Sequence, residues 1–331
     1  MSVTLAARAD GRLDLHARIL DLRKRGFVPV AGDLQPSGVI HDMRLTGTID
    51  PAEATLETIV AEQPNVAFEA TATTGGECCR DPIDRIRALA GARLDAGFGR
   101  RLAAEIGGPR GCSHLLVLGH LAASAAIRSL DRDRALHGPA PRRAAGERVF
   151  RRDLVVDGQE PAEGALQLAA QLTDLHLAPA PALAPPMNRF AEELEVRVET
   201  ELAFPGGEIG AIRGAERHRG SVDFERASWR EHDAALAWLV GRRFGAGITA
   251  ELLQRLGDGP DERPLLDTLL ALAPTMVQCA AAMSDAWAAA ARGAPSRIGL
   301  GGLPDSCYMW RREGALAQAR AAEAAAGPKR A

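Results

Sequence analysis

Aromatic residues are scarce in this chain of 331 residues: they make up 4%, and tyrosine occurs once. The chain also lacks an excess of one charge, because 40 lysines and arginines face 43 aspartates and glutamates, for a net charge of −3. Nucleic-acid-binding proteins usually carry a basic excess or a basic stripe. We therefore expect no nucleic acid partner.

Long apolar runs and the pattern of a secretory leader are lacking as well. The first 11 residues have no apolar core behind a basic start, and no run approaches the roughly 20 apolar residues that span a bilayer. These features predict a cytoplasmic protein with no membrane partner. The five cysteines are then expected to be free thiols or ligands rather than a disulfide framework.

Familiar motifs for cofactors and for hydrolysis are also missing. The sequence contains no GxGxxG loop before a helix, no Walker loop, no HExxH and no GxSxG. The length allows two ordinary domains, and a hydrophobic content of 46% allows sizeable cores.

Alternation with period two predicts strands in the first part of the chain. Arg12–Arg23 and Met43–Ile49 place their apolar residues on one face, and Ser2–Ala9 is a weaker candidate. Asp50 next to Pro51 then favours a helix from Pro51 to about Gln63, with Asp50 as its N-cap.

Helices are predicted further along. They are Asp81–Leu89, capped by Asp81, Phe98–Ile106, ended by Gly107, and Ser113–Leu130, with Ser113 as N-cap. Strands followed by helices indicate an α+β fold with an antiparallel sheet.

The second part of the chain echoes the first. Leu89–Phe98 aligns with Leu239–Ile248 at an offset of 150, and Gly164–Asp174 echoes Gly11–Asp21. We predict two tandem copies related by a pseudo-twofold axis, whose strand sets face each other or join edge to edge. The expected division is a first, site-bearing copy (1–136), a linker (137–147), a degenerate second copy (148–314), and a frayed or disordered tail (315–331).

Reactive side chains are concentrated in the first copy. These residues, each with its counterpart in the second copy, are His41-Asp42 with Glu192-Glu193, Cys79 with Trp229, Asp81 with Glu231, Arg85 with Ala235, Cys112 with Glu262, and His114 with Pro264. Residues needed for folding alone should persist in both copies. The difference indicates a chemical site in the first copy, supported by the second.

Each of these candidates also has a purely structural interpretation. Cys79 and Cys112 fit small buried hydrophobes, and Arg85 fits a solvated helix face, although it would also suit an anionic or phenolate substrate. His114 lies at a loop-to-helix junction, where free N–H groups bind anions. His41 and its neighbour in the strand point to opposite faces, so one of the two should face a given pocket.

Metal binding is the first chemical alternative. Cys79, Cys112, His114 and His41 offer soft and imidazole ligands, although their spacing is not that of a zinc finger.

The C-terminal part carries one more feature. It places Cys307 beside the single tyrosine, Tyr308. The structural interpretation is an edge strand with a packed cysteine and tryptophan. The functional one makes Tyr308 a hydrogen-bond donor or an acid in a pocket.

These strings resemble a known family, the bacterial domain-of-unknown-function 2889 family. The matching strings are Ile40–Met43, Cys79 before Leu89-Ala90-Gly91, Gly97-Phe98, Gly107-Gly108-x-x-Gly111-Cys112-Ser113-His114-Leu115, and Asp305–Tyr308 with Gly314. Two positions depart from the family's pattern. Val117 replaces an acidic residue, and Tyr308 replaces a histidine.

Within this family, the chain resembles phenylcoumaran γ-formaldehyde lyases in its doubled layout and altered tail. This resemblance implies a reaction. It implies a cofactor-free lyase for a small aromatic substrate from lignin, a phenolic aryl dimer bearing a primary alcohol. The products would be a stilbene and formaldehyde. Homodimerisation is left open by the sequence.

For this chemistry we assign roles to the candidate residues. His114 or His41 acts as the base, Asp42 orients a histidine, and Arg85 or Tyr308 lies at the phenolate. Three cysteines, namely Cys79, Cys112 and Cys307, line the substrate pocket. The alternatives are a metal-dependent hydrolase using cysteine and histidine ligands of the first copy, and a non-catalytic binding or scaffold protein.

Overall fold

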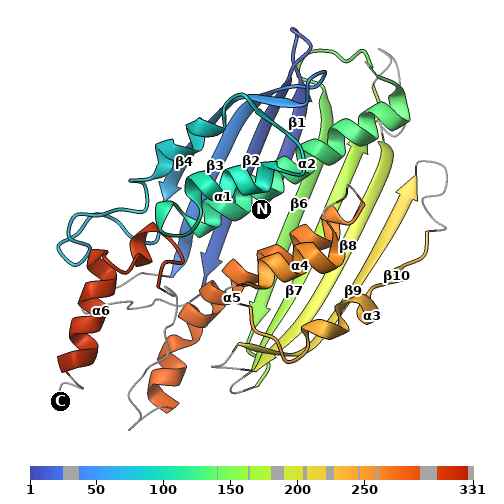
Figure 1. Cartoon of the computed structure of the whole chain (residues 1–331). Helices are drawn as coiled ribbons and strands as arrows, with labels where there is room; N and C mark the ends of the chain where they lie inside the picture. The colour runs from blue at the N-terminus through green and yellow to red at the C-terminus, as the bar shows by residue number, and fades with distance from the viewer. Residues whose placement is uncertain are drawn as a thin grey trace.

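Ten strands form one antiparallel sheet in the computed structural model of the chain (Figure 1). The strands are β1 Ser2–Ala7, β2 Leu13–Arg23, β3 Gly38–Asp50, β4 Thr55–Asn65, β5 Ala92–Arg93, β6 Arg148–Gln159, β7 Ala165–Leu177, β8 Phe190–Ala203, β9 Glu208–Gly220 and β10 Arg230–Glu231. Their order is β10-β9-β8-β7-β6-β1-β2-β3-β4-β5. Two strand sets, β1 to β5 and β6 to β10, join edge to edge in this sheet, because β1 pairs with β6. The predicted α+β class with an antiparallel sheet is confirmed.

The structure describes residues 1–24, 37–139, 141–162, 165–179, 190–203, 207–220, 227–244, 247–257, 259, 261–290 and 304–326. Several predicted features lie outside these residues. They are Gly164 of the echoed segment, Gly245 and Ala246 of the aligned segment, and residues 327–331 of the tail.

Helices cover one face of the sheet, as Figure 1 shows for α1, α2, α4 and α5. The helical segments are η1 Ile83–Leu89, α1 Phe98–Ile106, η2 Gly108–Arg110, α2 Ser113–His137, α3 Asp233–Leu236, η4 Ala237–Leu239, α4 Ile248–Leu256, α5 Arg263–Ala290, η5 Tyr308–Trp310 and α6 Ala315–Ala326. The long helices α2 and α5 contact each other and the central strands. Their apolar residues and those of the strands form one core.

The predicted alternation of β2 explains which residues enter that core. Leu13, Leu15 and Ile19 are buried on the helix-covered face, whereas His16 and Arg18 are exposed on the other face. A sheet with one face packed and one face in water gives this pattern. The buried row continues beyond the apolar residues, and its next members are polar.

The helix predicted from Pro51 to Gln63 is wrong, because this segment is a turn followed by β4. Asp50 does accept hydrogen bonds from the backbone N–H groups of Ala52 and Glu53, at 2.9 and 3.2 Å. The same side chain that caps a helix also closes a turn. The β-branched residues that follow, such as Ile59, pack well on a pleated sheet.

The other predicted helices are present with different bounds. α1 has the predicted residues, whereas Ile83–Leu89 is a 3₁₀ helix. Asp81 accepts a hydrogen bond from the Cys78 N–H (3.0 Å) instead of capping that helix. α2 continues to His137, and its N-cap is Cys112 rather than Ser113.

The C-terminal part is helical rather than a strand. Tyr308–Trp310 is a 3₁₀ helix, and Met309 and Trp310 are buried. α6 follows, and its Leu316 is fully buried against Met309 and Trp310. The interpretation of this segment as an edge strand is therefore wrong.

One described helix is longer and more apolar than expected from the sequence. Residues Arg263–Met283 of α5 have a mean hydropathy of 1.5, and by length and composition alone they could cross a membrane. Half of this span is buried inside the structure, where α5 packs on β6, β7 and β8. The expectation that no apolar run approaches this length is corrected.

Candidate functional site

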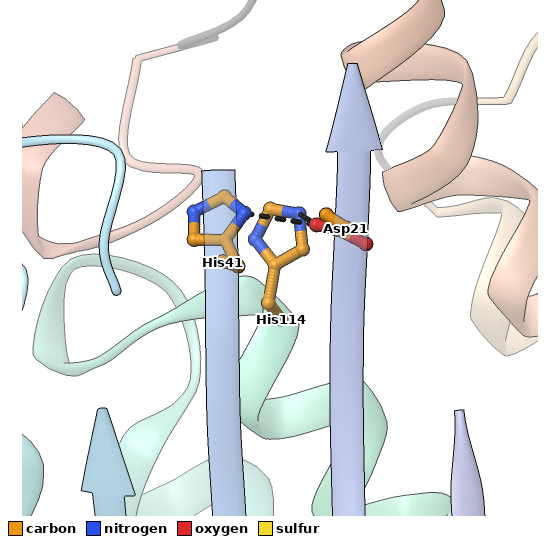
Figure 2. Close-up of side chains that lie close together, drawn as sticks. All are labelled: Asp21, His41 and His114. Carbon is orange, nitrogen blue, oxygen red and sulfur yellow. Dashed lines mark hydrogen bonds and ion pairs between the residues drawn. The ribbon is translucent and has the colours of Figure 1, made fainter. Parts of the chain in front are cut away.

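Asp21, His41 and His114 converge from three elements (Figure 2). His41 Nδ1 lies 2.8 Å from Asp21 Oδ2, and His114 Nε2 lies 3.2 Å from the same oxygen. The two imidazole rings are 4.1 Å apart between centroids and are tilted by 33°. One carboxylate oxygen therefore serves two neighbouring, mutually tilted histidines.

The fold explains this convergence. Asp21 continues the buried row of β2, and His41 of β3 is its direct partner in the strand register. Cross-strand partners of this kind lie on the same face of a sheet. His114 belongs to the first turn of α2, which packs on β2 and β3.

The site is largely closed to water. The side chains of His41 and His114 are 4% and 9% exposed, whereas that of Asp21 is 21% exposed. Cys112 hydrogen-bonds to the His114 side chain. The side-chain amide of Gln278 from α5 lies 3.2 Å from His114 Nε2, so the second part of the chain reaches the site.

Electrostatic effects shift the pKa values of the two histidines in opposite directions. Burial lowers the pKa of His114, but the adjacent Asp21 carboxylate outweighs this effect and raises that pKa to about 10. Burial and the positive charge of His114 lower the pKa of His41 to about 4, although Asp21 opposes them. Burial raises the pKa of Asp21, yet the two histidines hold it far below its usual range.

At neutral pH these directions give an Asp21 carboxylate, a protonated His114 and a neutral His41. His41 then donates Nδ1–H to Asp21, which leaves Nε2 as the basic nitrogen. The arrangement offers a proton donor and a proton acceptor side by side. Pairs of titratable groups with pKa values pushed apart are typical of acid–base catalysis.

The structure brings together two of the predicted catalytic residues and separates a third. Asp42 is on the opposite face of the sheet, where its carboxylate accepts hydrogen bonds from Arg18 (2.8 Å) and Arg44 (3.0 Å). The prediction that Asp42 orients a histidine is therefore wrong. Asp21 orients both histidines instead, and adjacent strand residues point to opposite faces, as expected.

The predicted cysteines lie near the start of α2. Cys112 is buried against Met43, with the two sulfurs 4.0 Å apart. Cys79 packs in a small cluster with Trp310, next to Cys307. Burial raises the pKa of Cys79 well above its usual range and that of Cys307 to about 11, so both are thiols at neutral pH.

The hydrogen bonds of Tyr308 and the exposed position of Arg85 do not involve the two histidines. The Tyr308 backbone N–H donates to the Gly111 carbonyl (2.8 Å), which anchors the C-terminal part beside α2. Its hydroxyl, however, donates to Asp81 (3.1 Å). Arg85 is exposed on η1.

The predicted ligand set of Cys79, Cys112, His114 and His41 is not assembled. Two other clusters are found within the part of the chain that the structure describes. In each, three potential ligand atoms lie within 4.8 Å of one another. One is Asp21 with His41 and His114, and the other is Asp133 with His137 and His176. One carboxylate and two imidazoles suit zinc or iron.

Sequence reasoning missed two residues of the site. Asp21 carried a signal, because it continues the period-two row of Leu13 and Ile19, and a carboxylate on a buried row needs a partner. Gln278 carried no such signal, because the sequence of a long apolar helix does not indicate which polar residue faces a distant histidine.

Comparison with known proteins gives one match, which covers the first part of the chain. Residues 1–128 match the model of a family described as "Protein of unknown function (DUF2889)". This match includes Asp21, His41 and His114. No curated protein and no solved structure matches the chain.

Proposed function

We propose that the chain, whose residues 1–128 match a family of unknown function, is a cofactor-independent acid–base lyase. Its substrate is a phenolic aryl dimer of the phenylcoumaran type, and its products are a stilbene and formaldehyde. The observation that carries the proposal is the shared carboxylate oxygen of Asp21, which lies 2.8 Å from His41 and 3.2 Å from His114. The substrate class comes from the sequence resemblance.

The reaction needs one acid and one base, and its electrons balance without an oxidant. The substrate phenolate expels the ring ether oxygen, and protonated His114 donates a proton to that leaving oxygen. The product of this step is a quinone methide, which is an electron sink within the substrate.

The second step releases formaldehyde. Neutral His41 takes the proton of the γ-hydroxyl group, and a carbon–oxygen double bond forms as the adjacent carbon–carbon bond breaks. The electron pair of that bond forms the stilbene double bond and restores the aromatic ring. A proton must then return from His41 to His114, whose rings are 4.1 Å apart on a common carboxylate.

Burial of the two histidines supports this chemistry. Water attacks quinone methides, so a site that excludes water protects the intermediate. The histidine side chains are at most 9% exposed. In such surroundings the charge of Asp21 also acts more strongly than it would in water.

We also propose that the chain is a tandem duplication whose second copy has lost the site. Gly91 and Gly241 both have a φ of +80° and precede helices of nine residues, α1 and α4. Asp174, the counterpart of Asp21, is instead buried in ion pairs with Arg152 and Arg128. The second copy contributes Gln278 to the site of the first.

A metal-dependent enzyme is the second candidate function. It is favoured by the ligand atoms of Asp21, His41 and His114, which lie within 4.8 Å of one another. Two histidines and one carboxylate are a common ligand set for catalytic metals. In this alternative the imidazoles bind a cation instead of transferring protons, and the site does not specify a substrate.

One experiment separates the two candidates. Purified protein is treated with a chelator, its zinc and iron content is measured, and formaldehyde release from a phenylcoumaran dimer is followed. We expect metal-free protein to release formaldehyde and stilbene in equal amounts. Activity that disappears with the chelator and returns with one metal would establish the second candidate. A chain inactive in both forms would contradict the proposed substrate.

A further inference from the structure

A second group of potential metal ligands lies at the far end of α2. Asp133 and His137 are one helical turn apart, and His176 is near the end of β7. His176 Nε2 lies 3.3 Å from Asp133 Oδ1, and the two imidazole rings are 6.1 Å apart between centroids. One ligand atom from each of the three residues lies within 4.8 Å of the others.

Two ring nitrogens of this cluster have no hydrogen-bond partner in the described parts of the chain. They are His137 Nε2 and His176 Nδ1, and both atoms are buried. Buried polar atoms normally have a partner, so each unpaired atom needs an explanation. A cation bound beside Asp133 would give one nitrogen of each ring a partner.

The carboxylate of the cluster also has a partner outside it. Arg143 makes a short ion pair with Asp133. Arg143 also donates to the Leu177 carbonyl (2.8 Å) and lies 3.6 Å from Glu147, so it keeps other partners when a cation binds Asp133.

We propose that Asp133, His137 and His176 bind one zinc ion, with water as the fourth ligand. Two imidazole nitrogens and one carboxylate oxygen are a set that zinc accepts in tetrahedral geometry, whereas magnesium and calcium require more oxygen ligands. The ion joins the end of α2 to β7 and so ties the two strand sets together from the helix-covered side.

This zinc site is separate from the candidate catalytic site. His114 and His137 lie at opposite ends of α2, which at 1.5 Å per residue places them about 35 Å apart. Its variants can therefore be compared directly with variants of the Asp21 site.

Zinc titration of the full chain by calorimetry, after removal of metals, tests the proposal. His137→Gln is the main variant, because His137 is partly exposed and the fold should tolerate the change. His41→Gln is the matched control at the other cluster. We expect His137→Gln to lose one equivalent of zinc, or to bind it more than about 100-fold more weakly. We expect His41→Gln to retain this equivalent.

A spectroscopic variant protects the test against a folding defect. His137→Cys should restore binding, and with cobalt(II) it should add the thiolate-to-cobalt absorption that the wild-type protein lacks. Equal zinc binding by the wild type and His137→Gln would overturn the proposal. So would loss of zinc in His41→Gln alone, which would place the metal at Asp21, or the absence of zinc binding by the wild type.

Discussion

The imidazole rings of His41 and His114 lie 4.1 Å apart, and each directs a nitrogen at the same oxygen of Asp21. Two protonated rings at this separation would repel each other in a buried site. One of them therefore stays neutral, and the carboxylate favours protonation of the other. This relationship between two histidines is the basis of the proposed acid–base function.

Replacing Asp21 by asparagine should remove the difference between the histidines. Without the carboxylate, the largest influence that raises the pKa of His114 is gone and burial dominates, so this pKa should fall from about 10 toward or below 6.5. Nitrogen-15 chemical shifts of the imidazoles, followed through a pH titration, measure this change. Asp14→Asn, on the exposed face of the same strand, is the control. An unchanged His114 titration in Asp21→Asn would show that another group protonates this ring.

The dependence of kcat/KM on pH should be bell-shaped. Protonation of His41 removes the base, so activity should fall as the pH drops toward about 4. Deprotonation of His114 removes the acid, so activity should also fall as the pH rises through about 10. Initial rates across this range measure both limbs. A single limb near pH 6.5 would indicate a histidine with an ordinary pKa and contradict the assignment.

Part of this fold could be predicted from periodicity alone. The alternation of Arg12–Arg23 and Met43–Ile49 predicted two central strands, and glycine stops predicted α1. β4 was missed because Asp50 and Pro51 give the same local signal for a turn as for a helix start. Local sequence does not decide between these outcomes, whereas pairing with β3 does.

The site was only half predictable for a related reason. His41 and His114 stood out as reactive residue types, but their partner depends on strand register. Asp42 is adjacent to His41 in sequence yet points to the opposite face, whereas Asp21 is its partner across the sheet. Contacts with α5, such as that of Gln278, depend on tertiary packing and leave no local pattern.

The buried ion pairs of the second half should contribute strongly to stability. Arg152 is fully buried and donates to Asp174 at 2.6 Å and to Asp267 at 2.5 Å. Arg152→Met would leave two buried carboxylates without this partner, at a cost of about 3–5 kcal/mol in the free energy of unfolding.

Urea denaturation measures this loss, and the neighbouring residue provides the control. Arg151 pairs with Asp153 on the exposed face, where both side chains are more than a third exposed. Arg151→Met should therefore change the free energy of unfolding by about 1 kcal/mol or less. Equal effects of the two substitutions would contradict the assigned role of burial.

Gly47 should tolerate no side chain, because β3 and β4 approach closely there. A Cβ atom on Gly47 would lie 2.5 Å from the Thr58 carbonyl oxygen. The strand must shift, so Gly47→Ala should lower the free energy of unfolding by about 1–3 kcal/mol. Gly210→Ala in β9 is the control, since its nearest atom would be at 3.7 Å. The midpoints of thermal unfolding of the two variants are compared. Similar midpoints would argue against this close approach.

The most direct test of the central claim is formaldehyde release from a phenylcoumaran dimer by His41→Gln beside His16→Gln. His16 lies on β2 like Asp21, but on the exposed face of the sheet. If His41 is the base, His41→Gln should lose about 10²–10⁴ in kcat, whereas His16→Gln should match the wild type. Wild-type rates in a folded His41→Gln variant would contradict the account and leave the Asp21 cluster without a catalytic role in this reaction.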